Sequence, residues 1–179
     1  MEVFDMSKVW VISDIHFGHA NIHKFRPIFN TPEENDATIL TNIIDKVGKR
    51  DTLWILGDCF FTTEAYHMFF DAVRCNKIHW IIGNHDTDCG FRQENVKRFC
   101  RETHPKFGKI GSLFKYGRFW LSHHPIHPME LRNRRNIHGH THFELMKHAD
   151  DSIDDRYINV CCEHTNYGPI QITKEEIIG

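Results

Sequence analysis

The sequence predicts a single α/β domain built on a largely parallel β-sheet that is covered by helices. Short apolar runs rich in β-branched and aromatic residues alternate with longer segments of helical periodicity, a pattern typical of βαβ units. Most of the apolar runs end in a polar loop that contains Asp, His or Asn. The 179 residues are most simply one domain, 1–179, because they show no internal repeat, low-complexity tract or linker.

The first half of the chain predicts three buried strands and three helices. The strands are expected over residues 8–13, 52–56 and 77–82. The first helix begins after Thr31 as N-cap, with Pro32 and Glu34 at its first and third positions, and Gly48 marks its end. Two further helices are expected over about 63–73 and about 94–101.

The second half of the chain predicts mainly short strands. Residues 107–115 and 118–122 are expected to form a hairpin that turns at Tyr116 and Gly117. Another short strand is expected at 136–138, and the last two at 157–160 and 170–172. Residues 147–155 are polar and acidic, which indicates a solvated loop.

Composition excludes few functions but sets a context. Hydrophobic residues make up 40% and charged residues 26%, and the formal net charge is −2, so nothing draws the whole chain to nucleic acid or anionic membranes, although a local basic patch stays open. No apolar run is long enough to span a bilayer and no secretory signal is visible, so we expect a cytoplasmic protein without membrane association. The six cysteines lack metal-ribbon spacing and are expected to be reduced, mostly buried thiols; the adjacent pair Cys161 and Cys162 has no explanation in the sequence alone.

Five polar motifs follow predicted strands. Each alone fits an ordinary turn, but the ends of parallel strands meet at one edge of a sheet, so together they predict one site. In chain order they are Asp14-x-His16, Gly57-Asp58, Gly83-Asn84-His85-Asp86, His123-His124 and Gly139-His140-Thr141-His142.

The residue types in these motifs predict a dinuclear metal site. Without His85, Asp86 and His124 the motifs offer four histidines, two aspartates and one asparagine, which suit Mn, Fe, Zn or Ni better than Ca or Mg, with Mn the ion expected in vitro. Seven ligands suit two divalent ions, which a shared carboxylate can bridge at about 3.5–4 Å. Such a pair lowers the pKa of a bound water and neutralises phosphate oxygens, which predicts phosphoester hydrolysis by a metal-bound hydroxide.

The ordered motifs resemble those of the calcineurin-like metallophosphoesterases over about residues 9–142. The first motif, Asp-x-His-Phe-Gly-His from Asp14 to His19, is similar to that of compact bacterial or phage phosphoesterases. The resemblance implies a four-layer α/β/β/α sandwich with the site at the strand ends. It implies one metal on Asp14, His16 and His142, a second on Asn84, His123 and His140, and Asp58 bridging both. It also makes His85 an acid or phosphate contact, and Asp86 the carboxylate that orients it.

Several positions stay open from the sequence. His123 and His124 would face opposite ways on a strand, and the family pattern favours His123. The Gly-His-x-His register selects His140 and His142 and leaves His138 as a strand residue or a supporting one. His19, near Asn21, either touches the substrate phosphate or is merely exposed. Among Arg132, Arg134 and Arg135, one (Arg135 is preferred) is expected to bind phosphate, against the alternative of a solvated charged run.

The substrate is only narrowed by the sequence. The chain lacks the Gly-Asp-x-x-Asp-Arg-Gly and Gly-Asn-His-Glu motifs of the family's protein phosphatases. We expect a small phosphoester or nucleotide, preferably a phosphodiester. The alternatives are a phosphomonoesterase or nuclease on the same site, or a catalytically silent module that binds metal or nucleic acid; charge does not favour nucleic acid, and the oligomeric state is open.

Overall fold

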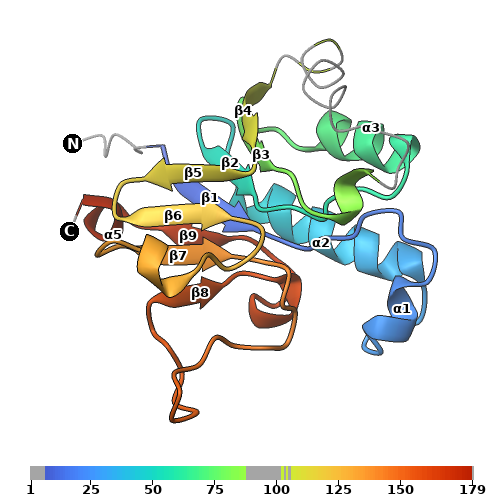
Figure 1. Ribbon diagram of the computed structural model, residues 1–179. Coiled ribbons are helices and arrows are strands. Elements are labelled where there is room, and N and C mark those ends of the chain that lie inside the picture. The colour runs from blue at the N-terminus through green and yellow to red at the C-terminus, as the bar shows by residue number, and fades with distance from the viewer. Residues whose placement is uncertain (1–6, 88–101, 103, 105, 179) are drawn as a thin grey trace.

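Two β-sheets form the centre of the protein in the computed structural model, which describes residues 7–87, 102, 104 and 106–178 (Figure 1). The first sheet has five strands in the order β4-β3-β2-β1-β9. They are β1 (Val9–Ile12), β2 (Thr52–Ile55), β3 (Lys77–Ile81), β4 (Phe107–Gly111) and β9 (Ile170–Ile172). The second sheet has the order β5-β6-β7-β8, with β5 (Leu113–Tyr116), β6 (Phe119–Ser122), β7 (Arg135–His138) and β8 (Tyr157–Asn159).

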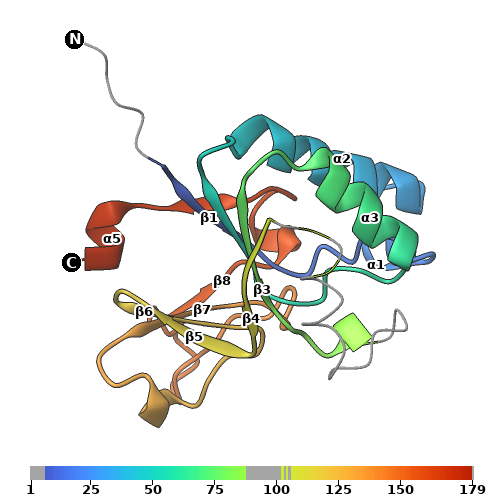
Figure 2. The ribbon, with the colours of Figure 1, turned by 90° about the horizontal axis from the view of Figure 1, so that it is seen from above.

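Helices α2 (Pro32–Lys46) and α3 (Thr63–Ala72) lie on one side of the first sheet, and the second sheet lies on the other side (Figure 2). The Thr31 side chain accepts a hydrogen bond from the Glu34 N–H at 3.2 Å, so the predicted cap of α2 is confirmed. Short elements complete the fold: α1 (Ile22–Phe25), η1 (His85–Thr87), η2 (Pro128–Glu130), η3 (Cys162–His164) and α5 (Lys174–Ile178).

The central strands β1, β2 and β3 are largely buried on both faces, which explains why they are mainly apolar. In β2, Leu53 and Ile55 pack under the helices, whereas Trp54 and the following Leu56 pack between the two sheets. This alternation follows from the period of two along a strand. The chain therefore folds as the predicted α/β sandwich, with η2 on the outer side of the second sheet (Figure 2).

Most predicted strands and two of the predicted helices are confirmed within one or two residues. The parallel order is also confirmed for β1 to β4, while β9 pairs antiparallel with β1. The single strand predicted over 107–115 is wrong, because the chain leaves the first sheet after Gly111 and enters the second at Leu113. The hairpin itself is confirmed between β5 and β6. The helix predicted over about 94–101 lies outside the described residues.

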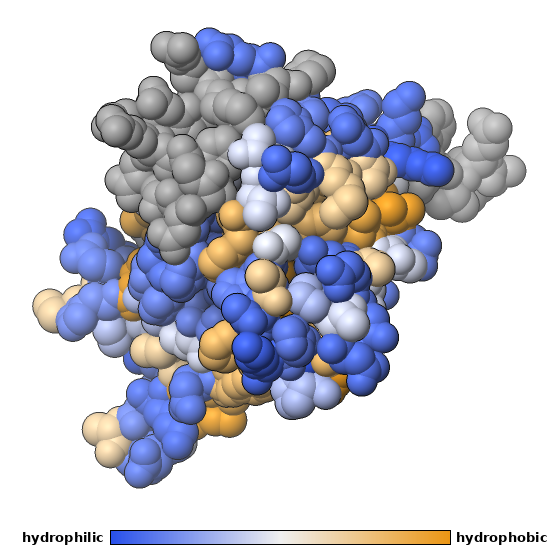
Figure 3. Space-filling model, turned by 90° about the vertical axis from the view of Figure 1, so that its right-hand side faces the viewer, coloured by the Kyte–Doolittle hydropathy of each residue, from blue (hydrophilic) through white to orange (hydrophobic). Residues whose placement is uncertain are grey.

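The carboxyl ends of the parallel strands meet at one edge of the molecule, which Figure 3 shows from outside. The two sheets join there, because Ser13, just after β1, bridges in parallel to Cys161, just after β8. The Ser13 N–H donates to the carbonyl oxygen of Val160 at 3.1 Å. Loops from both sheets therefore reach the same place. Over the described part of the chain, no helix is long and apolar enough to cross a membrane.

Candidate metal centre

The seven side chains predicted as ligands all leave from strand ends at this shared edge. Asp14 and His16 follow β1, Asp58 follows β2, Asn84 follows β3, His123 follows β6, and His140 and His142 follow β7. Backbone hydrogen bonds join neighbouring loops: the His16 N–H donates to the Asp58 carbonyl at 3.0 Å, and the Gly139 N–H donates to the His123 carbonyl at 2.9 Å. The loops therefore form one connected layer above the two sheets.

Five of these seven residues have a left-handed backbone. Their φ angles lie between 45° and 70°, a region that residues other than glycine rarely adopt; they are Asp14, His16, Asp58, His140 and His142. Such backbones persist only where surrounding structure holds them, and they gather at functional sites.

The first candidate ligand group is Asp14, His16 and His142, whose ligand atoms all lie within 4.8 Å of one another. Nε2 of His16 and Nε2 of His142 each lie 3.8 Å from Oδ1 of Asp14. Asp14 is fully buried, and among the described residues nothing donates a hydrogen bond to its Oδ1. Burial raises the pKa of Asp14, but the contacts with His16 and His123 outweigh it and hold that pKa well below its usual range.

The hydrogen bonds of His142 and His123 turn one ring nitrogen of each toward the carboxylates. Nδ1 of His142 lies 3.1 Å from Oε1 of Glu163, and Nδ1 of His123 lies 2.8 Å from the carbonyl oxygen of Leu56. A carbonyl and an ionised carboxylate only accept, so each Nδ1 carries a proton, and each Nε2 can present its lone pair to a metal ion when one is bound. A histidine that binds a metal is commonly fixed in this way.

The second candidate group gathers around His123. Its Nε2 lies 3.0 Å from Oδ1 of Asn84 and 3.4 Å from Oδ2 of Asp58. His123 also lies within ligand range of Asp14 and Asp58 together, and of His124 and His140 together. Asp58 therefore lies between the two groups, at the position where the family resemblance implies a bridging carboxylate.

Two motif glycines are required by the close approach of these loops. A Cβ on Gly83 would overlap Oδ1 of Asp58 and come within 2.5 Å of the Asp58 backbone nitrogen. A Cβ on Gly139 would overlap Asp14 Oδ2 and Ser13 Oγ. The glycines thus leave room for the carboxylates of the neighbouring strand, a reason that turn formation alone does not give.

His85 and Asp86 occupy different environments although they are adjacent. The His85 side chain is exposed and its backbone N–H donates to Asp58 Oδ1 at 2.8 Å. Asp86 is fully buried, and its carboxylate accepts from the backbone N–H groups of Asp58, Cys59 and Gly83 and from the Trp80 indole. Asp86 thus fixes the loops that carry Asp58 and Asn84. Its predicted action on the His85 ring stays a prediction.

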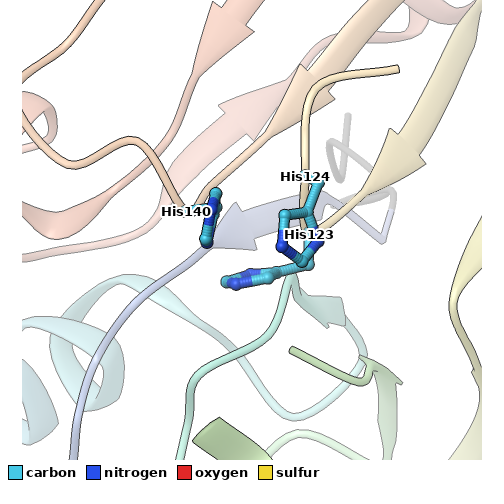
Figure 4. Close-up of side chains that lie close together, drawn as sticks. All are labelled: His123, His124 and His140. Carbon is cyan, nitrogen blue, oxygen red and sulfur yellow. The ribbon is translucent and has the colours of Figure 1, made fainter. Parts of the chain in front are cut away.

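His124 lies closer to the centre than the sequence indicated. β6 ends at Ser122, so His123 and His124 are both in the loop and the alternation expected of a strand does not apply. Figure 4 shows the His124 ring beside His140, with ring centroids 3.9 Å apart. His138, in contrast, is buried in β7, and its Nδ1 lies 2.8 Å from the Gly139 carbonyl.

The two predicted substrate-binding residues separate in space. His19 lies near the centre, with its ring centroid 6.1 Å from that of His16. Arg135 begins β7, whereas the ligands follow the end of that strand, so the structure does not bring Arg135 to this edge. Its Nε instead donates to the Asp155 carbonyl at 3.0 Å.

Four supporting residues were missed by sequence reasoning. Arg26 is 1% exposed and donates to the carbonyls of Asp14 and Ile15, to Asn35, and to Glu163 at 2.9 Å. Glu163 in turn contacts His142, as described above. The Cys161 thiol donates to Asp14 Oδ2 at 3.2 Å and the Cys162 thiol to the Ser13 carbonyl at 3.2 Å. The unexplained cysteine pair therefore supports the first ligand loop, and only the oddity of the pair hinted at it.

The donor set fits divalent metal ions. Metal–ligand bonds of about 2.0–2.2 Å allow one ion to join donors that lie up to about 4 Å apart. The buried Asp14 Oδ1 and both ring nitrogens of His16 have no hydrogen-bond partner among the described residues, which is costly unless a cation satisfies them. Among the described residues, no cysteine belongs to these candidate ligand groups, which keeps the preference for imidazole- and carboxylate-binding ions.

Comparison with known proteins agrees with this geometry. The profile of the calcineurin-like phosphoesterase family matches residues 7–175. The gene 66 protein of Mycobacterium phage L5 is 30% identical over 169 residues, covering 79% of this chain and 80% of its own. An uncharacterized protein of Methanocaldococcus jannaschii is 30% identical over 178 residues, covering 93% and 88%. A crystal structure of a protein of unknown function from Aquifex aeolicus superposes with a TM-score of 0.68 at 26% identity, covering 93% of this chain and 96% of that one.

Proposed function

The chain belongs to the calcineurin-like phosphoesterases, and from this we propose that it hydrolyses a small phosphoester, preferably a phosphodiester, at a pair of divalent metal ions. Asp14, His16 and His142 would hold one ion, and Asn84, His123 and His140 the other, with Asp58 between them. The observation that carries the proposal concerns the buried Oδ1 of Asp14. Among the described residues this oxygen accepts no hydrogen bond, and it lies 3.8 Å from one imidazole nitrogen of His16 and from one of His142.

The chain's own residues have separable tasks in this reaction. The chemistry that bound divalent cations supply is neutralisation of phosphate charge and activation of water. His85 stands exposed beside Asp58, where a protonated imidazole can give its proton to the departing oxygen. Asp86 holds the Asp58 and Gly83 backbones in place through buried hydrogen bonds.

We further propose Mn²⁺ as the ion that supports activity in vitro, with Fe, Zn and Ni as alternatives, and a cytoplasmic location. A small phosphoester or nucleotide is the expected partner; nucleic acid stays an alternative without support from net charge. A phosphomonoesterase or nuclease would use the same residues. A catalytically silent binding module is disfavoured by the complete set of ligand positions.

The test is hydrolysis of bis-p-nitrophenyl phosphate after reconstitution with Mn, Fe, Zn or Ni. Asp58→Asn should lower kcat by at least about 100-fold, because it removes the shared charge between the two groups. Asp151→Asn is the matched control, since this aspartate lies exposed in the loop before β8. No turnover with any metal, or equal rates for Asp58→Asn and the unaltered protein, would refute the enzymatic proposal.

A second variant separates metal binding from proton transfer. His85→Ala should keep both metal ions, measured by inductively coupled plasma mass spectrometry, and lose about 100-fold in kcat. Loss of metal in this variant would show that His85 is a ligand and would overturn its assigned role.

A further inference from the structure

An aromatic pocket opens directly beside the first ligand group. It has a volume of about 420 Å³, within the range of about 300–1,000 Å³ that is usual for small-molecule sites. We define its wall as His19, Ile22, Phe25, Phe61 and Phe143. His16, His85 and His142 also line it, so the pocket and the candidate metal centre share a boundary.

The apolar side chains of this wall come from the same loops as the ligands. Phe143 directly follows His142, Phe61 lies three residues after Asp58, and α1 begins six residues after His16. Phe25 is 67% exposed and Phe143 is 65% exposed. Single exposed phenylalanines are ordinary, but these two line one cavity that also contains candidate ligands.

The rings at the pocket contact one another in stacked, tilted and edge-on arrangements. Phe61 stacks on His16 with centroids 5.3 Å apart, and lies 5.6 Å from the His85 ring at 31°. His19 stands edge-on to Phe61 at 4.4 Å and edge-on to Phe25 at 6.0 Å. Stacked and edge-on contacts favour a flat aromatic group over an alkyl group of equal size.

The charged residues of the pocket restrict the chemical class of ligand that it can bind. No lysine or arginine is among the described residues that line it, and its one carboxylate, Glu163, is already paired with Arg26 and His142. A second phosphate would therefore find no lysine or arginine among the described lining residues. The pocket therefore suits an uncharged flat group, and not a polyphosphate chain.

We propose that this aromatic pocket binds the leaving alcohol of the substrate, and that this alcohol carries a flat aromatic ring of the nucleobase kind. The inference rests on the proposed function, in which His85 protonates the departing oxygen. Because His85 lies on the boundary between pocket and metal centre, the alcohol released at that point is held against Phe25, Phe61 and Phe143.

The first experiment measures binding without metal and without turnover. Saturation-transfer NMR on the metal-free protein compares adenosine with ribose, and benzyl alcohol with cyclohexylmethanol, a pair matched in size that differs in flatness. The aromatic member should bind at least about 10-fold more tightly in both pairs, given roughly 2- to 10-fold for each ring contact. Equal binding within either pair would overturn the proposal.

The second experiment uses the metal-loaded enzyme and two variants. The ratio of kcat/KM for adenosine 5′-phosphate to that for ribose 5-phosphate, each offered as monoester and as methyl diester, should be at least about 10. Phe25→Leu/Phe143→Leu should bring this ratio close to 1, mainly by lowering kcat/KM for adenosine 5′-phosphate. Met129→Leu, an exposed apolar change on η2, should leave the ratio as it was.

The outcomes separate this inference from the proposed function. If no ester is hydrolysed with any metal, the proposed function fails, and with it the leaving-group role, whatever the binding results show. If esters are hydrolysed with no preference for the base, or if the double variant slows both substrates equally, the assignment of the pocket is wrong while the proposed function stands.

Discussion

Replacing Arg26 with methionine tests whether a buried ion pair stabilises the loop that carries Asp14 and His16. The side chain of Arg26 is 0% exposed, and that of its partner Glu163 is only 3% exposed. Arg26→Met removes donors from Glu163, Asn35 and the carbonyls of Asp14 and Ile15. Leaving a buried carboxylate without its cation costs about 3–5 kcal/mol.

The pKa of Glu163 gives a second route to the magnitude. Burial raises this pKa, but the hydrogen bond with His142 and the charge of Arg26 lower it from 4.5 to about 2. Such a fall corresponds to about 3 kcal/mol, shared between His142 and Arg26, so the charge of Arg26 accounts for only part of it. With the donors that are also lost from Asn35 and two carbonyls, we expect Arg26→Met to cost about 3 kcal/mol. A carboxyl group whose pKa is lowered by folding stabilises the folded state, and this stabilisation is complete above pH 4.5. It is lost as the pH falls toward 2, so the whole effect is present at pH 7.

Urea unfolding at pH 7 measures the cost. Arg132→Met is the matched control, because Arg132 forms an ion pair of 3.2 Å with Glu130 but is 72% exposed, and it should cost under about 1 kcal/mol. The double variant Arg26→Met/Glu163→Met should cost less than its two single changes together, since it leaves no unpaired charge. The reasoning is refuted if Arg26→Met costs no more than Arg132→Met.

Three other outcomes follow from the described contacts. Gly139→Ala should lower the free energy of unfolding in urea by about 1–3 kcal/mol and weaken Mn²⁺ binding in calorimetry, because the added Cβ would displace Asp14. The control Gly48→Ala, whose Cβ would have its nearest contact at 3.4 Å, should change neither quantity. Glu163→Gln should lower Mn²⁺ affinity about 10- to 100-fold by releasing His142, and unchanged affinity would count against the hydrogen bond as its orienter. Burial, together with the charges of Lys77 and Lys109, lowers the pKa of His79 from 6.5 to about 4. Between these pH values the unfolded chain binds a proton that the folded protein does not, so the free energy of unfolding should fall by up to about 3 kcal/mol from pH 6.5 to pH 4. His79→Gln should make this pH dependence less steep.

The residues that follow strands were predictable because their placement is local. Asp14, Asp58 and His123 each come directly after an apolar run, and parallel strands bring such positions to a common edge. The order of the motifs then gave the family. The same local reasoning predicted the N-cap of α2, where Thr31 acts within three residues of its own position.

The supporting contacts were not predictable, because they join distant parts of the chain. Glu163 lies 137 residues from Arg26, and the Cys161 thiol reaches Asp14 across 147 residues. Nothing in the nearby sequence distinguishes these residues from surface charges or from buried residues that only fill the core. The break between β4 and β5 at Ser112 could not be predicted for the same reason. The residues on both sides of Ser112 fit a strand, and only the pairing with distant strands assigns them to different sheets.

The left-handed backbones at Asp14, His16, Asp58, His140 and His142 place activity and thermal resistance in opposition. Each such residue costs about 1 kcal/mol or more relative to a glycine at the same position. Laboratory selection for heat resistance alone would therefore drift toward glycine at these five positions and lose the ligands. Selection for turnover would keep them and must find its stability elsewhere, for instance in the helices that cover the first sheet.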